Sequence, residues 1–224
     1  MRPLFRNGLF TLSLAAAIGL AALAYSVVAD SASPPDKLAN GLERVPEAKT
    51  KLAYVMPGTN WSKYKTIALR PLEVPAEARD ASAGQTRRLR ESYMLGDKEV
   101  AALQDAYNKT MRDILGSAGF TFVDTPKDDT LVVAARILKL RLAAPLERTR
   151  QSYAGRGRTY SRGGGAMSIA AALADGQTNV VVAEVADHSY GSNMWQINNR
   201  VTNMADARQA FAKWARALRD TLKS

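Results

Sequence analysis

The sequence has no cysteine and only one histidine, His188, among its 224 residues. Without cysteine the chain can form no disulfide, thiolate nucleophile, iron–sulfur cluster or cysteine-ligated zinc site. It also lacks the cysteine to which a bacterial lipoprotein attaches its lipid. A single histidine excludes any metal site that needs two imidazole ligands. These absences exclude thiol-dependent enzymes and metal sites that need cysteine or two histidines.

Acidic residues are scarce relative to basic ones. The chain carries 21 Asp and Glu against 31 Lys and Arg, which gives a formal net charge of +10. Hydrophobic residues make up 46% of the sequence. This fraction is ordinary for a globular protein and too high for a wholly disordered one. The length fits one domain, or two very small ones, so the composition predicts a basic globular protein without indicating its activity.

Charge is absent from residues 7–29, which follow the basic residues Arg2 and Arg6. A basic start, an apolar stretch and small residues before Asp30 are typical of a secretory signal peptide. The alternative is a retained inner-membrane anchor, because 23 uncharged residues are enough to span a bilayer. We therefore expect a periplasmic protein after cleavage near Ala29 or, alternatively, an inner-membrane-anchored one.

The domain organisation follows from composition. Residues 30–50 contain three prolines and no sustained hydrophobic period, so we interpret them as a flexible linker. Periodic hydrophobic patterns begin near Lys51. We expect a signal peptide or anchor over 1–29, the linker over 30–50 and a single α+β domain over 51–224.

Two periodic patterns predict amphipathic helices. The first begins at Asp97, which we expect to be its N-cap, and ends near Gly116. The second covers residues 206–222. Their apolar stripes are Val100, Leu103, Tyr107, Met111 and Ile114 in the first helix, and Ala207, Phe211, Trp214, Leu218 and Leu222 in the second.

Strands are predicted over 65–74 and 130–142, with a short extended piece over 120–123. An Asp-Gly turn between 166–174 and 180–187 predicts a β-hairpin, although the alanine-rich first run also favours a helix. One sheet with two amphipathic helices is completed most simply when both helices are buried on one sheet face. We therefore predict a two-layer α+β sandwich with one mixed or antiparallel sheet of about four strands and two helices on one face.

Catalytic constellations are hard to find in this sequence. His188 lies beside Ser189, but neighbours on a strand point to opposite faces, and no G-x-S-x-G motif is present. Asp128–Asp129, or Glu184 with Asp187, would need to face a cleft at about 5–10 Å to act as acid and base. We expect a protein that is not an enzyme, with no catalytic residues, no metal and no cofactor.

The most distinctive feature is a basic, glycine-rich segment over residues 146–165, in which Glu147 is the only acid. It matches neither glycine-rich phosphate motif, so we expect no nucleotide cofactor. Arginine suits phosphate and carboxylate groups, and tyrosine is frequent at interfaces. Outside the inner membrane, the expected partner is an anionic envelope component or another envelope protein, and not nucleic acid. The alternative is a solvated loop whose charge only aids solubility. The residues proposed to contact the partner are Arg148, Arg150, Arg156, Arg158, Arg162, Tyr153 and Tyr160.

Several short motifs are ordered as in a known family. They are the stretch over 56–71 (MPGTNWSKYKTIALRP), the helix from Asp97, the strand from Asp129, the turn over 175–178, Asp187 and Trp214. Over roughly residues 51–222 these motifs make the chain resemble a bacterial envelope family, domain of unknown function 3313. The resemblance implies secreted or lipoprotein-type envelope proteins without an assigned activity, and it supplies no catalytic residues.

These observations together lead to one interpretation of function. We expect an exported, uncharacterised envelope protein that acts as a non-catalytic binding or assembly factor in the periplasm. One alternative is a structural subunit of an envelope complex, associated with the membrane through residues 7–29. A less favoured alternative is a carboxylate-based cell-wall hydrolase.

Overall fold

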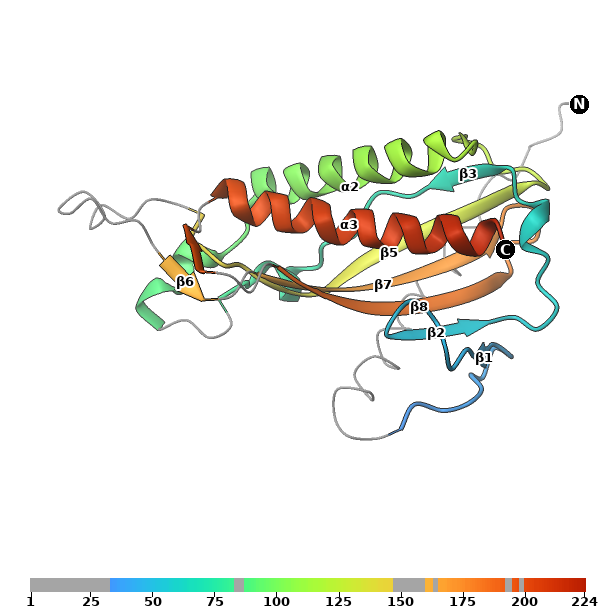
Figure 1. Ribbon diagram of the computed structural model, residues 1–224, viewed down its shortest axis with the longest axis horizontal. Coiled ribbons are helices and arrows are strands. Elements are labelled where there is room, and N and C mark those ends of the chain that lie inside the picture. The colour runs from blue at the N-terminus through green and yellow to red at the C-terminus, as the bar shows by residue number, and fades with distance from the viewer. Residues whose placement is uncertain (1–32, 83–86, 147–159, 163–164, 192–194, 198–199) are drawn as a thin grey trace, which may run out of the picture.

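The computed structural model describes residues 33–82, 87–146, 160–162, 165–191, 195–197 and 200–224. In this part of the chain, seven strands form the main sheet in the order β1-β2-β8-β7-β5-β3-β4. Helices α2 (Asp97–Ser117) and α3 (Arg200–Leu222) run along one face of that sheet (Figure 1). The predicted α+β class and its one sheet with two helices are confirmed, whereas the prediction of about four strands is wrong. The strands are β1 (Glu43–Arg44), β2 (Leu52–Val55), β3 (Thr66–Leu69), β4 (Thr121–Phe122), β5 (Thr130–Arg141), β7 (Ala166–Asp175) and β8 (Val181–Tyr190).

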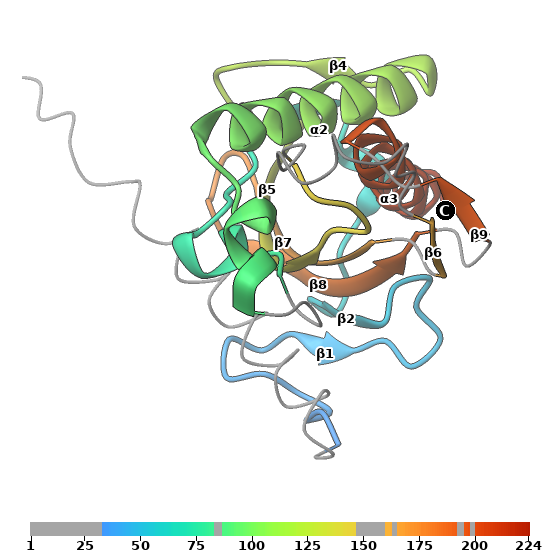
Figure 2. The same cartoon turned by 90° about the vertical axis from the view of Figure 1, so that its left-hand side faces the viewer.

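The additional strands are the short ones at the sheet edges. β1 and β2 have two and four residues, which is too short for an alternating pattern to identify them, whereas β4, with two residues, lies within the extended piece predicted over 120–123. They form because partners distant in sequence supply their hydrogen bonds, as when Leu52 pairs with Ala186. The sheet is mixed, because β3 runs parallel to β4 and β5 whereas the other pairs are antiparallel. Figure 2 shows β1 at the edge farther from α2.

The ordered fold starts within the segment predicted to be a linker. Lys37 forms a bridge with Glu43, and β1 pairs with β2. Leu42 is fully buried with Leu52 and Tyr54. These contacts add a strand to the sheet edge, which a proline-containing and charged segment does not reveal by its composition alone. The boundary expected near Lys51 therefore lies too late in the chain.

The central strands place large side chains toward the helices and small ones away from them. On β7, Met167, Ile169 and Leu173 join the core beneath α2 and α3, whereas Ala170 and Ala172 face the other side. The long pairing of β7 with β5 and β8 settles the alanine-rich run as a strand. Backbone hydrogen bonds with two neighbouring strands outweigh the helix propensity of alanine.

The two helices pack through the predicted apolar stripes. Tyr107 of α2 meets Phe211 of α3 edge to face, with ring centroids 5.5 Å apart. The N-cap of α2 is Gly96, one residue before the predicted Asp97, whose carboxylate instead accepts a hydrogen bond of 2.9 Å from Arg79. α3 begins at Arg200, six residues before the predicted start at residue 206.

Short 3-10 turns connect these elements. They are η1 (Trp61–Lys63), η2 (Ala76–Arg79) and η3 (Arg87–Tyr93). A separate two-stranded sheet pairs β6 (Tyr160–Arg162) with β9 (Trp195–Ile197). Among the described residues, no helix is both long and apolar enough to cross a membrane.

Candidate functional site

The predicted contact residues lie almost entirely outside the described ranges. This holds for Tyr153 and for the arginines up to residue 158, namely Arg148, Arg150, Arg156 and Arg158. Tyr160 and Arg162 are the first and last residues of β6, which pairs with β9. The structure therefore places only the backbone of this end of the basic segment, and the partner hypothesis stays a prediction.

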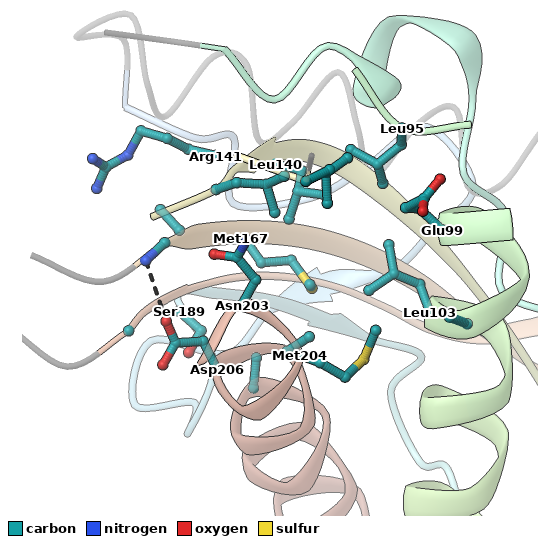
Figure 3. Close-up of a pocket in the computed structure, with 18 residues that line it drawn as sticks. Leu95, Glu99, Leu103, Leu140, Arg141, Met167, Ser189, Asn203, Met204 and Asp206 are labelled. Atoms are coloured by element: carbon teal, nitrogen blue, oxygen red, sulfur yellow. Dashed lines mark hydrogen bonds between the residues drawn. The ribbon is translucent and has the colours of Figure 1, made fainter. Parts of the chain in front are cut away.

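An open pocket lies at the end of the sandwich where the basic segment begins and ends. Leu146, just before that segment's first arginine, and Gly165, just after its last, both line the pocket. The space is about 650 Å³, which includes the part open to solvent. α2 and α3 form its walls, and the ends of β5 and β7 form its floor (Figure 3). Its apolar lining includes Leu95, Leu103, Leu140, Met167, Met204 and Ala207.

Asn203 fixes the start of α3 beside this pocket. Its side-chain oxygen accepts hydrogen bonds from the backbone nitrogens of Ala143 and Ala144 at 3.1 and 3.2 Å. Its amide nitrogen donates to the carbonyl oxygen of Ala144 at 2.8 Å. One turn later, Asp206 accepts a hydrogen bond of 3.3 Å from the nitrogen of Gly165. These polar groups of the lining therefore hold α3 to the strand ends.

The sequence does not reveal this pocket, because its lining comes from several segments that are far apart along the chain. Leu103 belongs to α2, Leu140 to β5, Met167 to β7 and Met204 to α3. Each of these residues fits the ordinary apolar pattern of its own element. Only the spacing of the two helices over the sheet shows that these side chains leave space between them.

Asp187, singled out by the family motifs, has a structural role. This buried carboxylate of β8 accepts hydrogen bonds from the Trp214 indole nitrogen at 2.8 Å and from Lys213 at 2.6 Å. Its other oxygen accepts from the backbone nitrogen of Lys51 at 2.9 Å. Asp187 thus joins the sheet to α3 and to the approach to β2.

Asp175 has a similar role at the other end of the sheet. It ends β7 and accepts hydrogen bonds from the side chains of Lys63 and Tyr64, near η1. It also accepts from the backbone nitrogen and the hydroxyl of Thr178 at 2.9 and 3.0 Å. Burial alone would raise the pKa of Asp175, but the Lys63 and Thr178 hydrogen bonds hold it well below its ordinary value. The motif residues Lys63, Tyr64 and Asp175 therefore stabilise the fold.

The carboxylates considered as an acid and base pair are not brought together. Glu184 and Asp187 stand three residues apart on one strand, so they point to opposite faces of the sheet. Glu184 is fully buried on the face without helices, where Asn40 donates a hydrogen bond of 2.9 Å to it. Asp187 points toward α3. This pair therefore cannot share one substrate.

The histidine and its serine neighbours are also divided by the sheet. Ser189 lines the pocket, whereas His188 Nδ1 lies 2.7 Å from the hydroxyl of Ser168 on the opposite face. Ser168 is only 1% exposed, so a substrate has no access to its hydroxyl. Burial lowers the pKa of His188, with Asp187 opposing this effect. Within the described ranges, no group of three or more His, Asp or Glu side chains is placed to hold a metal ion.

Comparison with known families tests the family resemblance that the short motifs predict. The model of the DUF3313 family, described as proteins of unknown function, matches residues 36–218. The chain belongs to the DUF3313 family. The resemblance drawn from the short motifs is thereby confirmed, and the match includes most of the segment that we expected to be a linker. No curated protein matches the chain significantly.

Several solved structures are similar to this DUF3313 protein at low identity. A PelC dodecamer from Paraburkholderia phytofirmans is 11% identical, with 75% of this chain and 95% of that chain covered and a TM-score of 0.41. Protein XCC0632 from Xanthomonas campestris is 13% identical, with coverage of 75% and 88% and a TM-score of 0.38. A minor lipoprotein from Acinetobacter baumannii is 11% identical, with coverage of 70% and 94% and a TM-score of 0.32.

Proposed function

We propose that this protein is exported to the bacterial envelope and acts there as a non-catalytic binding protein. The observation that carries the proposal is the pocket at the end of the sandwich. Its lining is mainly apolar, and two of its polar residues, Asn203 and Asp206, bond to the backbone of the protein itself. Polar groups engaged in this way position elements of the fold, whereas catalysis needs groups that face the reacting atoms.

The second part of the proposal concerns the basic segment. Arg148, Arg150, Arg156, Arg158 and Arg162 lie between two pocket-lining residues in sequence, with Glu147 as the only acid. Guanidinium groups pair with phosphate and carboxylate in two-pronged geometry. We propose that this segment contacts an anionic envelope component or an acidic surface of another envelope protein.

Export is tested by fractionating cells and measuring the intact mass of the native protein. A periplasmic species that starts at Asp30 is the expected result, because residues 1–29 have the order of a signal peptide. A full-length species in the inner membrane would favour the tethered structural subunit instead. A full-length species in the cytoplasm would overturn the proposal.

Anion binding is tested with vesicles of phosphatidylglycerol and phosphatidylethanolamine at rising salt concentration. The variant with all five segment arginines changed to Ala should lose most of its salt-sensitive binding, because exposed charges are screened within about 10 Å at 0.1 M salt. A matched control removes the same charge from five exposed lysines elsewhere. These are Lys51, Lys98, Lys127, Lys139 and Lys223. Equal losses in both variants would remove the specific role of the segment.

A further inference from the structure

We infer that the pocket between α2, α3 and the ends of β5 and β7 binds an unbranched hydrocarbon chain, such as the acyl chain of a fatty acid or of a lipid. This inference rests on the proposed binding function and names the chemical class of the ligand. It concerns only the described residues around the pocket, and does not depend on the basic segment.

The middle of the pocket is made of flexible aliphatic and thioether side chains. In Figure 3, Leu103 of α2, Met204 of α3 and Met167 of β7 point toward one another across the space. Methionine has no branch and several rotatable bonds, so it adapts to chains of varying shape. None of the described lining residues is aromatic, so a flat ring would find no stacking partner there. The lining therefore favours a hydrocarbon chain over an aromatic ligand.

Two polar residues of the lining, Asn203 and Arg141, do not offer their polar groups to the middle of the pocket (Figure 3). Asn203 uses both its oxygen and its nitrogen on the backbone of residues 143 and 144. Arg141 lines the pocket, but its guanidinium group points away from the other lining side chains (Figure 3). Glu99 and Asp206 lie on opposite sides of the space in the same view. A polar group placed among Leu103, Met167 and Met204 would lose its hydrogen bonds to water, which is unfavourable unless it finds new partners.

The shape of the pocket suits a ligand with an apolar chain and one polar end. The space is open on one side, so a ligand with a polar head can keep that head in solvent. Each methylene group that enters such a site is worth about a fourfold gain in affinity, until the space is filled.

The test measures binding of saturated fatty acids of 8 to 16 carbons to the purified full chain by isothermal titration calorimetry. We expect the dissociation constant to fall with each added methylene and then to level off when the pocket is full. A fatty acid carrying a diazirine on its chain should crosslink to the peptides that contain Leu103, Met167 or Met204. Affinity that does not depend on chain length, or no binding at any length, would overturn the inference.

Two neighbouring residues of α2 provide a matched pair of variants. Ala102 lines the pocket, whereas Ala101 is exposed and does not. We expect Ala102→Phe to fill the space and weaken binding of the best fatty acid at least tenfold, while Ala101→Phe binds as the wild type does. Both changes carry the same helix propensity, so a difference between them reports on the pocket. Equal affinity in the two variants would contradict the inference.

Further measurements distinguish a free fatty acid from a lipid as the source of the hydrocarbon chain. They also distinguish the pocket inference from the proposed role of the basic segment. Lysophosphatidylethanolamine with the same chain length shows whether a lipid headgroup is accepted as well as a free carboxylate. The variant without the five segment arginines should keep its chain-length dependence even when it no longer binds anionic vesicles. If chains fail to bind while vesicle binding persists, the pocket inference fails and the proposed function stands. The reverse result would retain the pocket and reject the role of the basic segment.

Discussion

The carboxylate of Asp187 on β8 accepts a hydrogen bond of 2.8 Å from the indole nitrogen of Trp214 on α3. Lys213, the residue before Trp214, donates to the same oxygen at 2.6 Å. Asp187 and Trp214 are almost fully buried, so neither of their polar groups could turn to water if its partner were removed. This contact attaches α3 to the sheet, and α3 also forms one wall of the pocket.

Replacing Asp187 should destabilise the protein strongly. Asp187→Ala leaves the Trp214 indole and the backbone nitrogen of Lys51 without their acceptor, so we expect a loss of about 3 kcal/mol in the free energy of unfolding. Urea titration followed by circular dichroism measures this loss. Asp128→Ala, at an exposed turn, is the control and should change stability by less than about 0.5 kcal/mol. Similar losses in the two variants would contradict the structural role of Asp187.

The Asp175 contacts predict a loss of stability in acid. The pKa of Asp175 in the folded protein lies well below its ordinary value of 3.8, despite the opposing effect of burial, because Lys63 and Thr178 donate to the carboxylate. The stabilisation is therefore complete above pH 3.8 and is lost as the pH falls below that value. At pH 7 we expect Asp175→Asn to be about 2 kcal/mol less stable than the wild type.

The measurement for Asp175 is urea unfolding from pH 7 down to pH 2. The difference between the wild type and Asp175→Asn should shrink below pH 4, because the unfolded wild-type chain then binds a proton at Asp175 that the folded protein does not bind. Asp128→Asn is the exposed control. A difference that stays constant over the whole range would show that the charge of Asp175 is not what stabilises the fold.

Glu184 predicts the opposite dependence. Burial raises its pKa above the ordinary 4.5, and the hydrogen bond from Asn40 opposes this only in part. Its second carboxylate oxygen is buried and has no hydrogen-bond partner in the described part of the chain. The folded protein therefore binds a proton on the Glu184 carboxyl group more tightly than the unfolded chain does. Stability is therefore fully present below pH 4.5 and falls as the pH rises through the raised pKa.

The variant that checks this dependence is Glu184→Gln, which keeps the shape and cannot ionise. We expect its unfolding free energy to decline less between pH 5 and pH 8 than that of the wild type. Glu91→Gln, at an exposed position, should follow the wild type. If Glu184→Gln has the same pH profile as the wild type, another group is responsible for the decline.

Gly176 is required by its surroundings in the turn after β7. A Cβ atom at this position would lie 2.6 Å from the carbonyl oxygen of Lys127 and 2.8 Å from Cβ of Thr130. Because a carbonyl of the main chain moves only with its whole segment, we expect Gly176→Ala to cost about 1–3 kcal/mol. Gly116→Ala is the control, since nothing lies within 4 Å of its Cβ and α2 favours alanine by about 1 kcal/mol. Thermal unfolding should show a lower Tm for the first variant and an unchanged or higher Tm for the second.

The elements that the sequence predicts well are those whose pattern is local and long. α2 and the strands β5, β7 and β8 carry ten or more residues each, enough for a period to be visible. The motif residues Asp175, Asp187 and Trp214 can be recognised in the sequence because they belong to the short motifs that the chain shares with the family. Their partners are not visible in the sequence, because Asp175 contacts Lys63 across more than a hundred residues. The short strands β1 and β2 escape prediction because they contain too few residues to show a period.

The sequence by itself determined the chemistry that this protein can draw on, the helices with their apolar faces, and the family to which it belongs. These properties depend on residue type and on spacing along the chain, both of which are local. Only the tertiary structure decided the seven-stranded sheet, the separation of Glu184 from Asp187, and the pocket of Leu103, Met167 and Met204. Each of these depends on how segments far apart in the chain pack together, and an empty space between side chains has no residue of its own in the sequence.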